Sequence, residues 1–284
     1  MIRVLKSGFY TTIQDAGRTS NRQFGVPVSG VMDAYSSEFA NALLGNDSGC
    51  AVLEITMTGP ELQFTTPTQI AFSGASMNPM INGQRVSNNK RITILPNDIL
   101  SFGRLEKGLR CYLAIKNGLQ TEVILGSQSM YTGITTVKTI QKGDAITYEP
   151  YEESSNRANA SVKYSSKTLE AHELTVFKGP EYDKLNKKQE AMLLNTQFEV
   201  SKYNNRMAYQ LMPQIKNTLN GIITTPVLPG TVQLTPAGHL IVLMRDCQTT
   251  GGYPRILQLS EDAINSLSQK RQGDTFTFSL SLNL

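Results

Sequence analysis

Polar residues and glycines that could bind an anion or move a proton gather in two segments near the start of the chain. Residues 12–18 read Thr-Ile-Gln-Asp-Ala-Gly-Arg, and the guanidinium of Arg18 beside Asp15 could orient a carboxylate or a phosphate. Residues 25–33 hold two glycines and a proline, and Ser29 with the N–H groups of a following helix start would form a concavity that favours anions. A simpler interpretation also fits both segments, in which Asp15 pairs with Arg18 inside a turn and the second loop caps a helix.

A third segment, at 244–254, is denser in such residues and follows a predicted apolar strand at 240–244. Paired threonines followed by paired glycines let a ligand approach the backbone closely, while hydroxyl and N–H groups act as donors. Asp246 is a candidate acid, base or orienting group. The candidate substrate-binding residues of this segment are Thr249, Thr250, Gly251, Gly252 and Tyr253.

A fourth segment, Leu-Gly-Ser-Gln-Ser at 125–129, follows a predicted strand at 122–125. The sequence identifies no base partner for its serines, which disfavours a Ser-His-Asp triad. The two histidines, His172 and His239, are isolated, and surface or turn positions suit both. Any chemistry must therefore depend on Asp, Arg, Thr, Tyr and backbone donors.

Cysteine usage argues against a disulfide framework and against a zinc site. The three cysteines, Cys50, Cys111 and Cys247, are odd in number and widely spaced, and no C-x-x-C motif occurs. We therefore predict no bound metal, and a reducing cytoplasm as the location. The chain also lacks the G-x-x-x-x-G-K-[ST] phosphate loop of a self-contained ATPase.

Composition places the chain among globular proteins. With 39% hydrophobic residues in 284, it can bury a real core. A net charge of +4 is too balanced to predict a nucleic-acid partner. No run of 18 apolar residues predicts a membrane span, and residues 1–10 read as a strand rather than a signal peptide.

The elements that must position these segments are mostly short strands. Residues alternate with period two at 69–72, 91–95 and 111–115, and turn residues recur about every ten positions. Three helices are expected. The first, at 34–44, has Asp33 as its N-cap and Gly45 as its stop, and the others lie at 183–194 and at 261–270.

An internal repeat organises the strands. A turn, an Asp and a period-two strand recur at 97–102, 143–148 and 273–278, each with an apolar residue two positions after the Asp and an aromatic residue four after it. The Asp can bond its own turn backbone. Segment 54–61 is echoed at 173–181, which indicates tandem related β-domains, although chance similarity of short strand words is an alternative. We predict domains at 1–150 and 168–284, joined by a polar linker at 151–167.

At the four polar segments the sequence resembles a known family, called allophanate hydrolase subunit 2 or biotin-dependent carboxyltransferase-like. The matching words, spread in order over nearly the whole chain, are T-I-Q-D-x-G-R at 12–18, G-V-P-x-S-G-x-M-D at 25–33, N-x-L-x-G-N at 41–46, L-E-I-T at 53–56, G-x-R-x-Y-L-A at 108–114, L-G-S-x-S at 125–129, N-R-M-x-Y-x-L at 205–211 and D-x-Q-T-T-G-G-Y-P at 246–254. Relatives commonly have Gly and Arg where this chain has Ala208 and Gln210, and a glycine pair where it has Asn117-Gly118.

The resemblance implies a mainly β fold of two tandem cyclophilin-like β-barrel domains with a few short helices. A free-standing chain of this size resembles the C subunits of bacterial ATP-dependent 5-oxoprolinases, which are also described as antagonists of a kinase inhibitor. It would then act with subunits A and B, which are LamB/YcsF-like and kinase-inhibitor-like chains. Such complexes open 5-oxo-L-proline to L-glutamate and use ATP. We expect no biotin to be attached to this chain itself.

That reaction defines the residue types that a site needs. Phosphorylating the lactam oxygen makes a leaving group, so donors must meet a developing oxyanion and a carboxylate must manage protons. The residues assigned to these tasks are Asp15, Arg18, Arg206 and Asp246 as catalytic candidates, with Ser29, Arg110 and residues 249–253 for substrate binding.

Two other functions remain open from the sequence. One is a carboxyltransferase component that acts on urea or a related amide, with biotin on a separate carrier, because no Met-Lys-Met carrier motif occurs here. The other is a regulatory protein that binds a kinase inhibitor without turnover. Both would present an apolar patch to a partner.

Overall fold

The computed structural model describes residues 1–152 and 163–281, and its contacts divide the chain into two compact units. Unit 1 comprises Met1–Gly17 and Asp33–Ser166, and unit 2 comprises Arg18–Met32 and Lys167–Leu284. The sequence gives no sign that residues 18–32 group with the second half of the chain. Most of the predicted linker at 151–167 lies outside the described residues, and the predicted domain limits stay a prediction.

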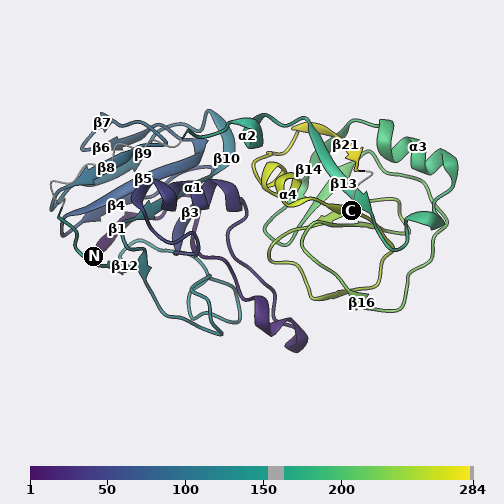
Figure 1. Ribbon diagram of the computed structural model, residues 1–284, viewed down its shortest axis with the longest axis horizontal. Coiled ribbons are helices and arrows are strands. Elements are labelled where there is room, and N and C mark those ends of the chain that lie inside the picture. The colour runs from purple at the N-terminus through teal and green to yellow at the C-terminus, as the bar shows by residue number, and fades with distance from the viewer. Residues whose placement is uncertain (153–162, 282–284) are drawn as a thin grey trace. The chain divides into compact units, whose positions relative to one another are not determined.

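Unit 1 is built from two sheets (Figure 1). Within the described residues, the strands of the larger sheet, in spatial order, are β11 (Leu119–Gln120), β12 (Ala145–Tyr148), β1 (Ile2–Lys6), β4 (Glu61–Phe64), β9 (Ile99–Phe102), β6 (Pro79–Ile81) and β7 (Gln84–Arg85). Those of the smaller sheet are β2 (Tyr10–Gln14), β3 (Val52–Thr56), β10 (Lys107–Ile115), β5 (Thr68–Ser76) and β8 (Arg91–Ile94). Alternate side chains such as Leu53, Ile55 and Leu113 are buried in the apolar core of this unit.

Helix α1 (Ala34–Leu44) begins and ends where the sequence predicts. The Asp33 carboxylate accepts a hydrogen bond from the Ser36 N–H at 3.0 Å, and Gly45 ends the helix with a φ of 65°. Phe39 and Leu44 are buried on the helix, which packs against β5 and β10 (Figure 1). The helix therefore covers the face of the five-stranded sheet that turns away from the apolar core.

Unit 2 is centred on a closed barrel. Its strands, in order around the barrel, are β13 (Glu173–Lys178), β20 (Arg255–Leu259), β17 (Thr231–Leu234), β18 (Leu240–Leu243), β15 (Ala208–Met212), β14 (Phe198–Asn204) and β21 (Thr275–Leu280). Strand β21 runs parallel to β13, and this pairing closes the barrel. A two-stranded ribbon joins β16 (Thr225–Pro226) to β19 (Thr250–Gly251).

Short helices complete unit 2. They are η1 (Thr19–Phe24), α2 (Lys167–Glu170), η2 (Tyr182–Lys184), α3 (Lys187–Asn195) and α4 (Glu261–Ser268). Ser260 caps α4 by accepting a hydrogen bond from the Ala263 N–H, as the sequence suggests. The helix predicted at 183–194 is a 3₁₀ turn followed by α3, because Asn186 caps a new helix and its side chain accepts from the Gln189 N–H.

The three repeats have the predicted geometry. In each turn the Asp carboxylate accepts from the N–H three residues earlier: Leu95 to Asp98 at 2.8 Å, Gln141 to Asp144 at 2.7 Å, and Arg271 to Asp274 at 2.8 Å. Strands β9, β12 and β21 follow directly. Two of the repeats lie in unit 1 and one in unit 2.

One predicted strand is wrong. Residues 122–125 form no strand, because Ile124 and Ser127 bridge a tight turn in which Leu125 and Gly126 both adopt positive φ, at 53° and 80°. The mainly β fold class with a few short helices is confirmed, and the barrel of unit 2 is closed.

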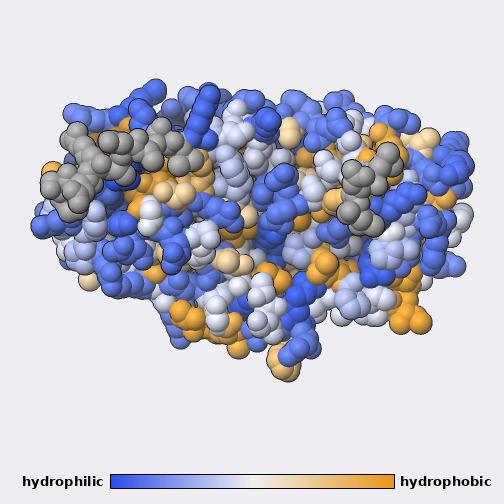
Figure 2. Space-filling view, in the orientation of Figure 1, coloured by the Kyte–Doolittle hydropathy of each residue, from blue (hydrophilic) through white to orange (hydrophobic). Residues whose placement is uncertain are grey.

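The face of the molecule in Figure 2 is mostly hydrophilic, with hydrophobic residues in small separate groups. Scattered apolar surface of this kind is normal for a folded protein. Over the described ranges, no helix has the length and apolar character that crossing a membrane requires.

Candidate functional site

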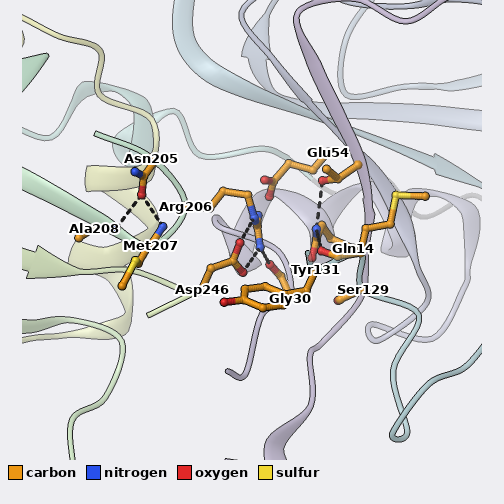
Figure 3. A network of polar contacts seen from close by, with 12 residues as sticks. Gln14, Gly30, Glu54, Ser129, Tyr131, Asn205, Arg206, Met207, Ala208 and Asp246 are labelled. Carbon is orange, nitrogen blue, oxygen red and sulfur yellow. Dashed lines mark hydrogen bonds and ion pairs between the residues drawn. The ribbon is translucent and has the colours of Figure 1, made fainter. Parts of the chain in front are cut away.

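Arg206 is the central side chain of the candidate site in unit 2. It lies in the turn between β14 and β15, where the Asn205 side-chain oxygen accepts hydrogen bonds from the N–H groups of Met207 (2.8 Å) and Ala208 (3.1 Å) (Figure 3). These two bonds fix the turn. Only 6% of Arg206 is exposed, so its guanidinium points into the unit.

The Arg206 guanidinium forms a two-pronged ion pair with Asp246 (Figure 3). Nε lies 2.8 Å from Oδ2 and Nη2 lies 2.9 Å from Oδ1, while Nη2 also donates to the Gly30 carbonyl at 2.6 Å. A bidentate pair fixes direction as well as distance. Asp246 is thus an oriented carboxylate with 12% of its side chain exposed, which suits a group that accepts a proton or aligns a substrate.

Ser29 lies next to the Gly30 carbonyl that Arg206 binds. Its φ of 57° is in the left-handed region, where a residue with a Cβ is strained. Its N–H donates to the Arg245 carbonyl at 3.0 Å. Its Oγ is buried and has no hydrogen-bond partner among the described residues, so the hydroxyl is a group that a polar ligand could satisfy.

The segment 18–32 is attached to the rest of unit 2 at several points. The Arg22 guanidinium donates to the Val227 carbonyl, and the Ser29 N–H donates to the Arg245 carbonyl. Within the segment, the Arg18 N–H donates to the Val28 carbonyl at 2.7 Å. Met32 belongs to the apolar core of the barrel. Arg18 itself is only 1% exposed. The contacts therefore hold Arg18, Ser29, Arg206 and Asp246 in one unit.

The Thr-Thr-Gly-Gly-Tyr stretch uses much of its backbone to hold the ribbon. The Thr249 carbonyl accepts from the Val227 N–H at 3.0 Å, and the Gly252 carbonyl accepts from the Ile222 N–H at 2.9 Å. Thr250 and Gly251 form β19 and pair with β16. Tyr253 is 42% exposed and is the large side chain that this stretch presents to solvent.

Gly251 leaves room for a buried side chain that lies against it. A Cβ added at this position would lie 2.4 Å from Nε2 of Gln233, a residue of β17 that is 2% exposed. That Nε2 has no hydrogen-bond partner within the described chain. The missing Cβ thus lets the ribbon close over a buried amide.

Unit 1 holds a second group of buried polar side chains, on the face of the five-stranded sheet opposite the apolar core. The register places Tyr112 opposite Glu54, and Glu54 opposite Thr12, so all three share this face. Arg110 is on the same face, with Nε 3.7 Å from Glu54 Oε1, and both side chains are at most 4% exposed. Arg110 therefore lies in a buried charged layer.

Tyr112 connects this layer to helix α1. Its hydroxyl accepts a hydrogen bond from the Asp33 N–H at 2.8 Å. Burial raises the pKa of Tyr112 well above its ordinary value, and the nearby carboxylates of Glu54 and Asp33 raise it further. The phenol therefore stays protonated over the physiological pH range.

Asp15 links two of the polar segments in unit 1. Oδ1 accepts from the Gly17 N–H at 2.8 Å and from the hydroxyls of Ser127 and Ser129, both at 2.6 Å. Oδ2 accepts from the Gln128 N–H at 2.6 Å. These contacts favour a role for Asp15 in holding the 127–129 loop, and its catalytic role stays a prediction.

The structure thus divides the predicted site residues between the units. Arg18, Ser29, Arg206, Asp246 and residues 249–253 belong to unit 2, while Asp15 and Arg110 belong to unit 1. Sequence reasoning missed Glu54 and Tyr112. A signal existed for Glu54, because a charged residue stands between Leu53 and Ile55 in a strand whose other residues carry no charge. Gln233 gave no such signal.

In the parts of the chain that the structure describes, no group of three or more His, Cys, Asp or Glu side chains could hold a metal ion. The polar groups at the two sites are guanidinium, hydroxyl and amide groups, which can donate hydrogen bonds, and carboxylates, which accept them. They suit recognition of a polar organic substrate.

The comparisons with known proteins agree with this architecture. The C subunit of the 5-oxoprolinase from Escherichia coli is 31% identical over 98% of this chain and 90% of its own length, and that from Haemophilus influenzae is 28% identical over the same shares. The crystal structure of the Kluyveromyces lactis urea carboxylase superimposes with a TM-score of 0.86 at 28% identity. This match covers 98% of the present chain and 27% of the urea carboxylase chain.

A family model described as the carboxyltransferase domain, subdomain A and B, matches residues 24–280. The match includes the Arg110–Glu54 and Arg206–Asp246 pairs and the whole barrel of unit 2. The chain therefore belongs to the carboxyltransferase domain family, subdomain A and B.

Proposed function

We propose that this chain is the C subunit of an ATP-dependent 5-oxoprolinase complex, which hydrolyses 5-oxo-L-proline to L-glutamate together with subunits A and B. The observation that carries the proposal is the end-to-end similarity to the C subunit from Escherichia coli, over 98% of this chain and 90% of that protein. The three cysteines are free, which fits a reducing cytoplasm as the location.

The Arg206–Asp246 pair supports a role in this reaction. Opening a lactam requires a carboxylate that manages protons and donors that stabilise an oxyanion. We assign proton handling to Asp246, with Arg206 as the residue that positions it. Ser29 Oγ and the exposed Tyr253 are the groups to which we assign substrate contact. We assign ATP to the complex as a substrate.

Reconstitution tests the proposal. The chain is purified with its A and B partners, and glutamate release is measured from 5-oxo-L-proline and ATP. We expect activity only when all three chains are present. Full activity from A and B alone would refute the role of this chain.

A variant tests the site within that assay. Asp246→Asn keeps the size of the side chain and removes its charge, and we expect at least a hundredfold lower kcat, the scale of a lost acid–base group. Asp183→Asn, at an exposed position in η2, is the matched control and is expected to keep full activity. Equal activity of the two variants would exclude Asp246 from the chemistry.

A second candidate function is carboxyl transfer to urea or a related amide. The family match and the superposition on a urea carboxylase favour it. Biotin would arrive on a separate carrier protein. The test is consumption of free carboxybiotin in the presence of urea, and a rate equal to the uncatalysed decay would exclude this function.

A further inference from the structure

A buried amide on the outer face of the barrel of unit 2 lacks a hydrogen-bond partner. Gln233 stands in β17 between Val232 and Leu234, whose side chains belong to the apolar core of the barrel. Because side chains alternate along a strand, the Gln233 side chain points to the outer face. Gln233 is 2% exposed, and neither Nε2 nor Oε1 forms a hydrogen bond with any residue that the structure describes.

The ribbon of β16 and β19 covers this amide. A Cβ added at Gly251 in β19 would lie 2.4 Å from Gln233 Nε2, so this face of the ribbon is turned toward Gln233. Thr225 of β16 is the register partner of Gly251, and opposite residues of an antiparallel pair share a face. The Thr225 side chain therefore faces the barrel as well. Its Oγ1 is also buried, with no hydrogen-bond partner in the described ranges.

The surroundings of the two groups offer no partner for them. Val227, Leu243 and Cys247 form a small apolar cluster beneath the ribbon and contribute no side-chain nitrogen or oxygen. Leaving a buried donor unpaired is unfavourable, so nearly all such groups in native proteins have a partner. An amide from a barrel strand and a hydroxyl from the ribbon thus meet at one contact where a further polar molecule would complete both.

The chemistry of a primary amide defines which molecule fits. Gln233 presents one N–H donor and one carbonyl acceptor side by side. A ligand whose own C=O and N–H lie on the same edge meets both through two parallel hydrogen bonds, just as a glutamine reads the adjacent donor and acceptor of an adenine. A five-membered lactam ring holds its amide in this cis arrangement, and urea presents the same edge. Both candidate functions above act on an amide of this kind.

We propose that Gln233 recognises the amide edge of the substrate, which belongs to the class of small cis-amides. Nε2 donates to the ligand carbonyl oxygen, Oε1 accepts from the ligand N–H, and the Thr225 hydroxyl donates to the same carbonyl oxygen. Gln233 thereby determines specificity, separately from the proton handling assigned to Asp246. The choice of ligand class rests on the proposed function. Entry requires the ribbon, which has two residues in each strand, to lift from the barrel.

Binding of pyrrolidin-2-one to the full chain tests the proposal. N-methylpyrrolidin-2-one is the comparison probe, because it keeps the ring and the carbonyl group but lacks the N–H. Side-chain amide signals in nitrogen-15 NMR spectra report the site, and titration gives Kd. We expect the Gln233 signals to shift, and pyrrolidin-2-one to bind about tenfold more tightly or better, because the methylated probe leaves Oε1 unpaired. Equal affinities would overturn the proposal. Absence of binding would also overturn it and leave an ordered water as the partner of Gln233.

Two variants make the binding test specific. Gln233→Met keeps the approximate length of the side chain and removes both hydrogen-bonding groups, so we expect binding of pyrrolidin-2-one to weaken about tenfold or more. Its unfolding temperature should not fall, because no hydrogen bond within the described chain is lost. Gln210→Met is the matched control: Gln210 stands in β15, and its Nε2 lies 3.0 Å from His239 Nδ1. The control is expected to bind as the unmodified chain does. Unchanged binding by Gln233→Met would refute the assignment.

The reconstituted assay separates this inference from the proposed function. With Gln233→Met we expect the KM for 5-oxo-L-proline to rise about tenfold or more, while the KM for ATP stays unchanged. Should the complex be inactive although pyrrolidin-2-one binds at Gln233, the proposed function fails and the inference stands. Should the complex be active with the same KM for both forms of the chain, the inference alone fails.

Discussion

The Arg110–Glu54 pair of unit 1 and the Arg206–Asp246 pair of unit 2 are both buried, but they are built in different ways. Arg110 and Glu54 stand on neighbouring strands of one sheet, and Arg110 Nε lies 3.7 Å from Glu54 Oε1. Arg206 and Asp246 stand on loops and meet through two bonds of 2.8 and 2.9 Å.

The register of the sheet explains the difference. Arg110 lies directly opposite Thr56, and Tyr112 lies opposite Glu54, so Arg110 and Glu54 are diagonal neighbours. The strands cannot change register by one residue to shorten this distance, because such a slip would turn all their side chains to the opposite face of the sheet. The backbone of a loop is not bound by strand register, so two loop side chains can approach each other more closely. A sheet therefore supplies a rigid polar layer, while loops supply close and directional contacts.

The largest expected effect follows from breaking the pair in unit 2. Arg206→Ala leaves the Asp246 carboxylate and the Gly30 carbonyl without their donor, and we expect a loss of about 3–5 kcal/mol of unfolding free energy. Urea denaturation of the purified chain measures it. Arg271→Ala is the control, because Arg271 and Asp274 are 45% and 38% exposed at 3.9 Å, and we expect about 0–1 kcal/mol there. Equal losses would show that the pair in unit 2 is not a stabilising contact.

A double-mutant cycle compares the two pairs directly. For Arg206 with Asp246 we expect a coupling energy of about 2–3 kcal/mol, because this pair is bidentate, and for Arg110 with Glu54 about 1 kcal/mol or less, because Nε and Oε1 are 3.7 Å apart. Both cycles use alanine variants and the same denaturation assay. A larger coupling in unit 1 would contradict the argument from strand register.

A third prediction concerns the ribbon that covers Gln233. Gly251→Ala would bring a Cβ to 2.4 Å from Gln233 Nε2 and 3.1 Å from Val227 Cγ1. We expect a loss of about 1–3 kcal/mol from overpacking. Gly252→Ala is the matched control, since its nearest neighbour would be the Ile222 carbonyl oxygen at 3.6 Å. Thermal unfolding measures the difference in stability between the two variants. Equal stability would show that the Gln233 side chain can turn away freely, and would contradict the prediction.

The smallest effect on stability is expected at Ser29, where the effect on activity should be larger. Ser29→Gly relieves a φ of 57° but adds freedom to the unfolded chain, so we expect a change within about 1 kcal/mol. Ser29→Ala keeps the strain and removes a hydroxyl with no partner in the described chain, so its stability should also change little. In the reconstituted assay both variants should lose activity together. Retention of full activity by Ser29→Ala would remove this hydroxyl from the site.

Much of the fold could be predicted from sequence because its signals are local. Helix α1, its Asp33 cap and its Gly45 stop each depend on residues within one or two turns. The three Asp turns are equally local. The prediction of a strand at 122–125 was wrong because Leu125, an apolar residue, adopts a left-handed conformation that its residue type disfavours.

The site was harder to predict because its contacts are long-range. Arg206 and Asp246 were both identified, but their pairing and the use of the Gly30 carbonyl depend on how the loops meet. Asp15 gave the same sequence signal as Asp246, and its contacts with Ser127 and Ser129 show that it supports a loop. Residue type and spacing do not separate these two environments. The buried position of Glu54 follows from its strand neighbours, and that of Gln233 from a ribbon distant in sequence.

Because residues 18–32 belong to unit 2, they affect how the chain can be divided into fragments and when unit 2 can fold during synthesis. If the coding sequence were divided after Ser166, the N-terminal fragment would keep Ser29, Gly30 and Met32 but would lack the barrel. On the ribosome, these early residues must wait until β21 has emerged, because the barrel closes only when β21 pairs with β13. A C-terminal fragment expressed alone would need a second copy of residues 18–32, supplied in trans or by fusion, before Arg206 could regain its carbonyl acceptor.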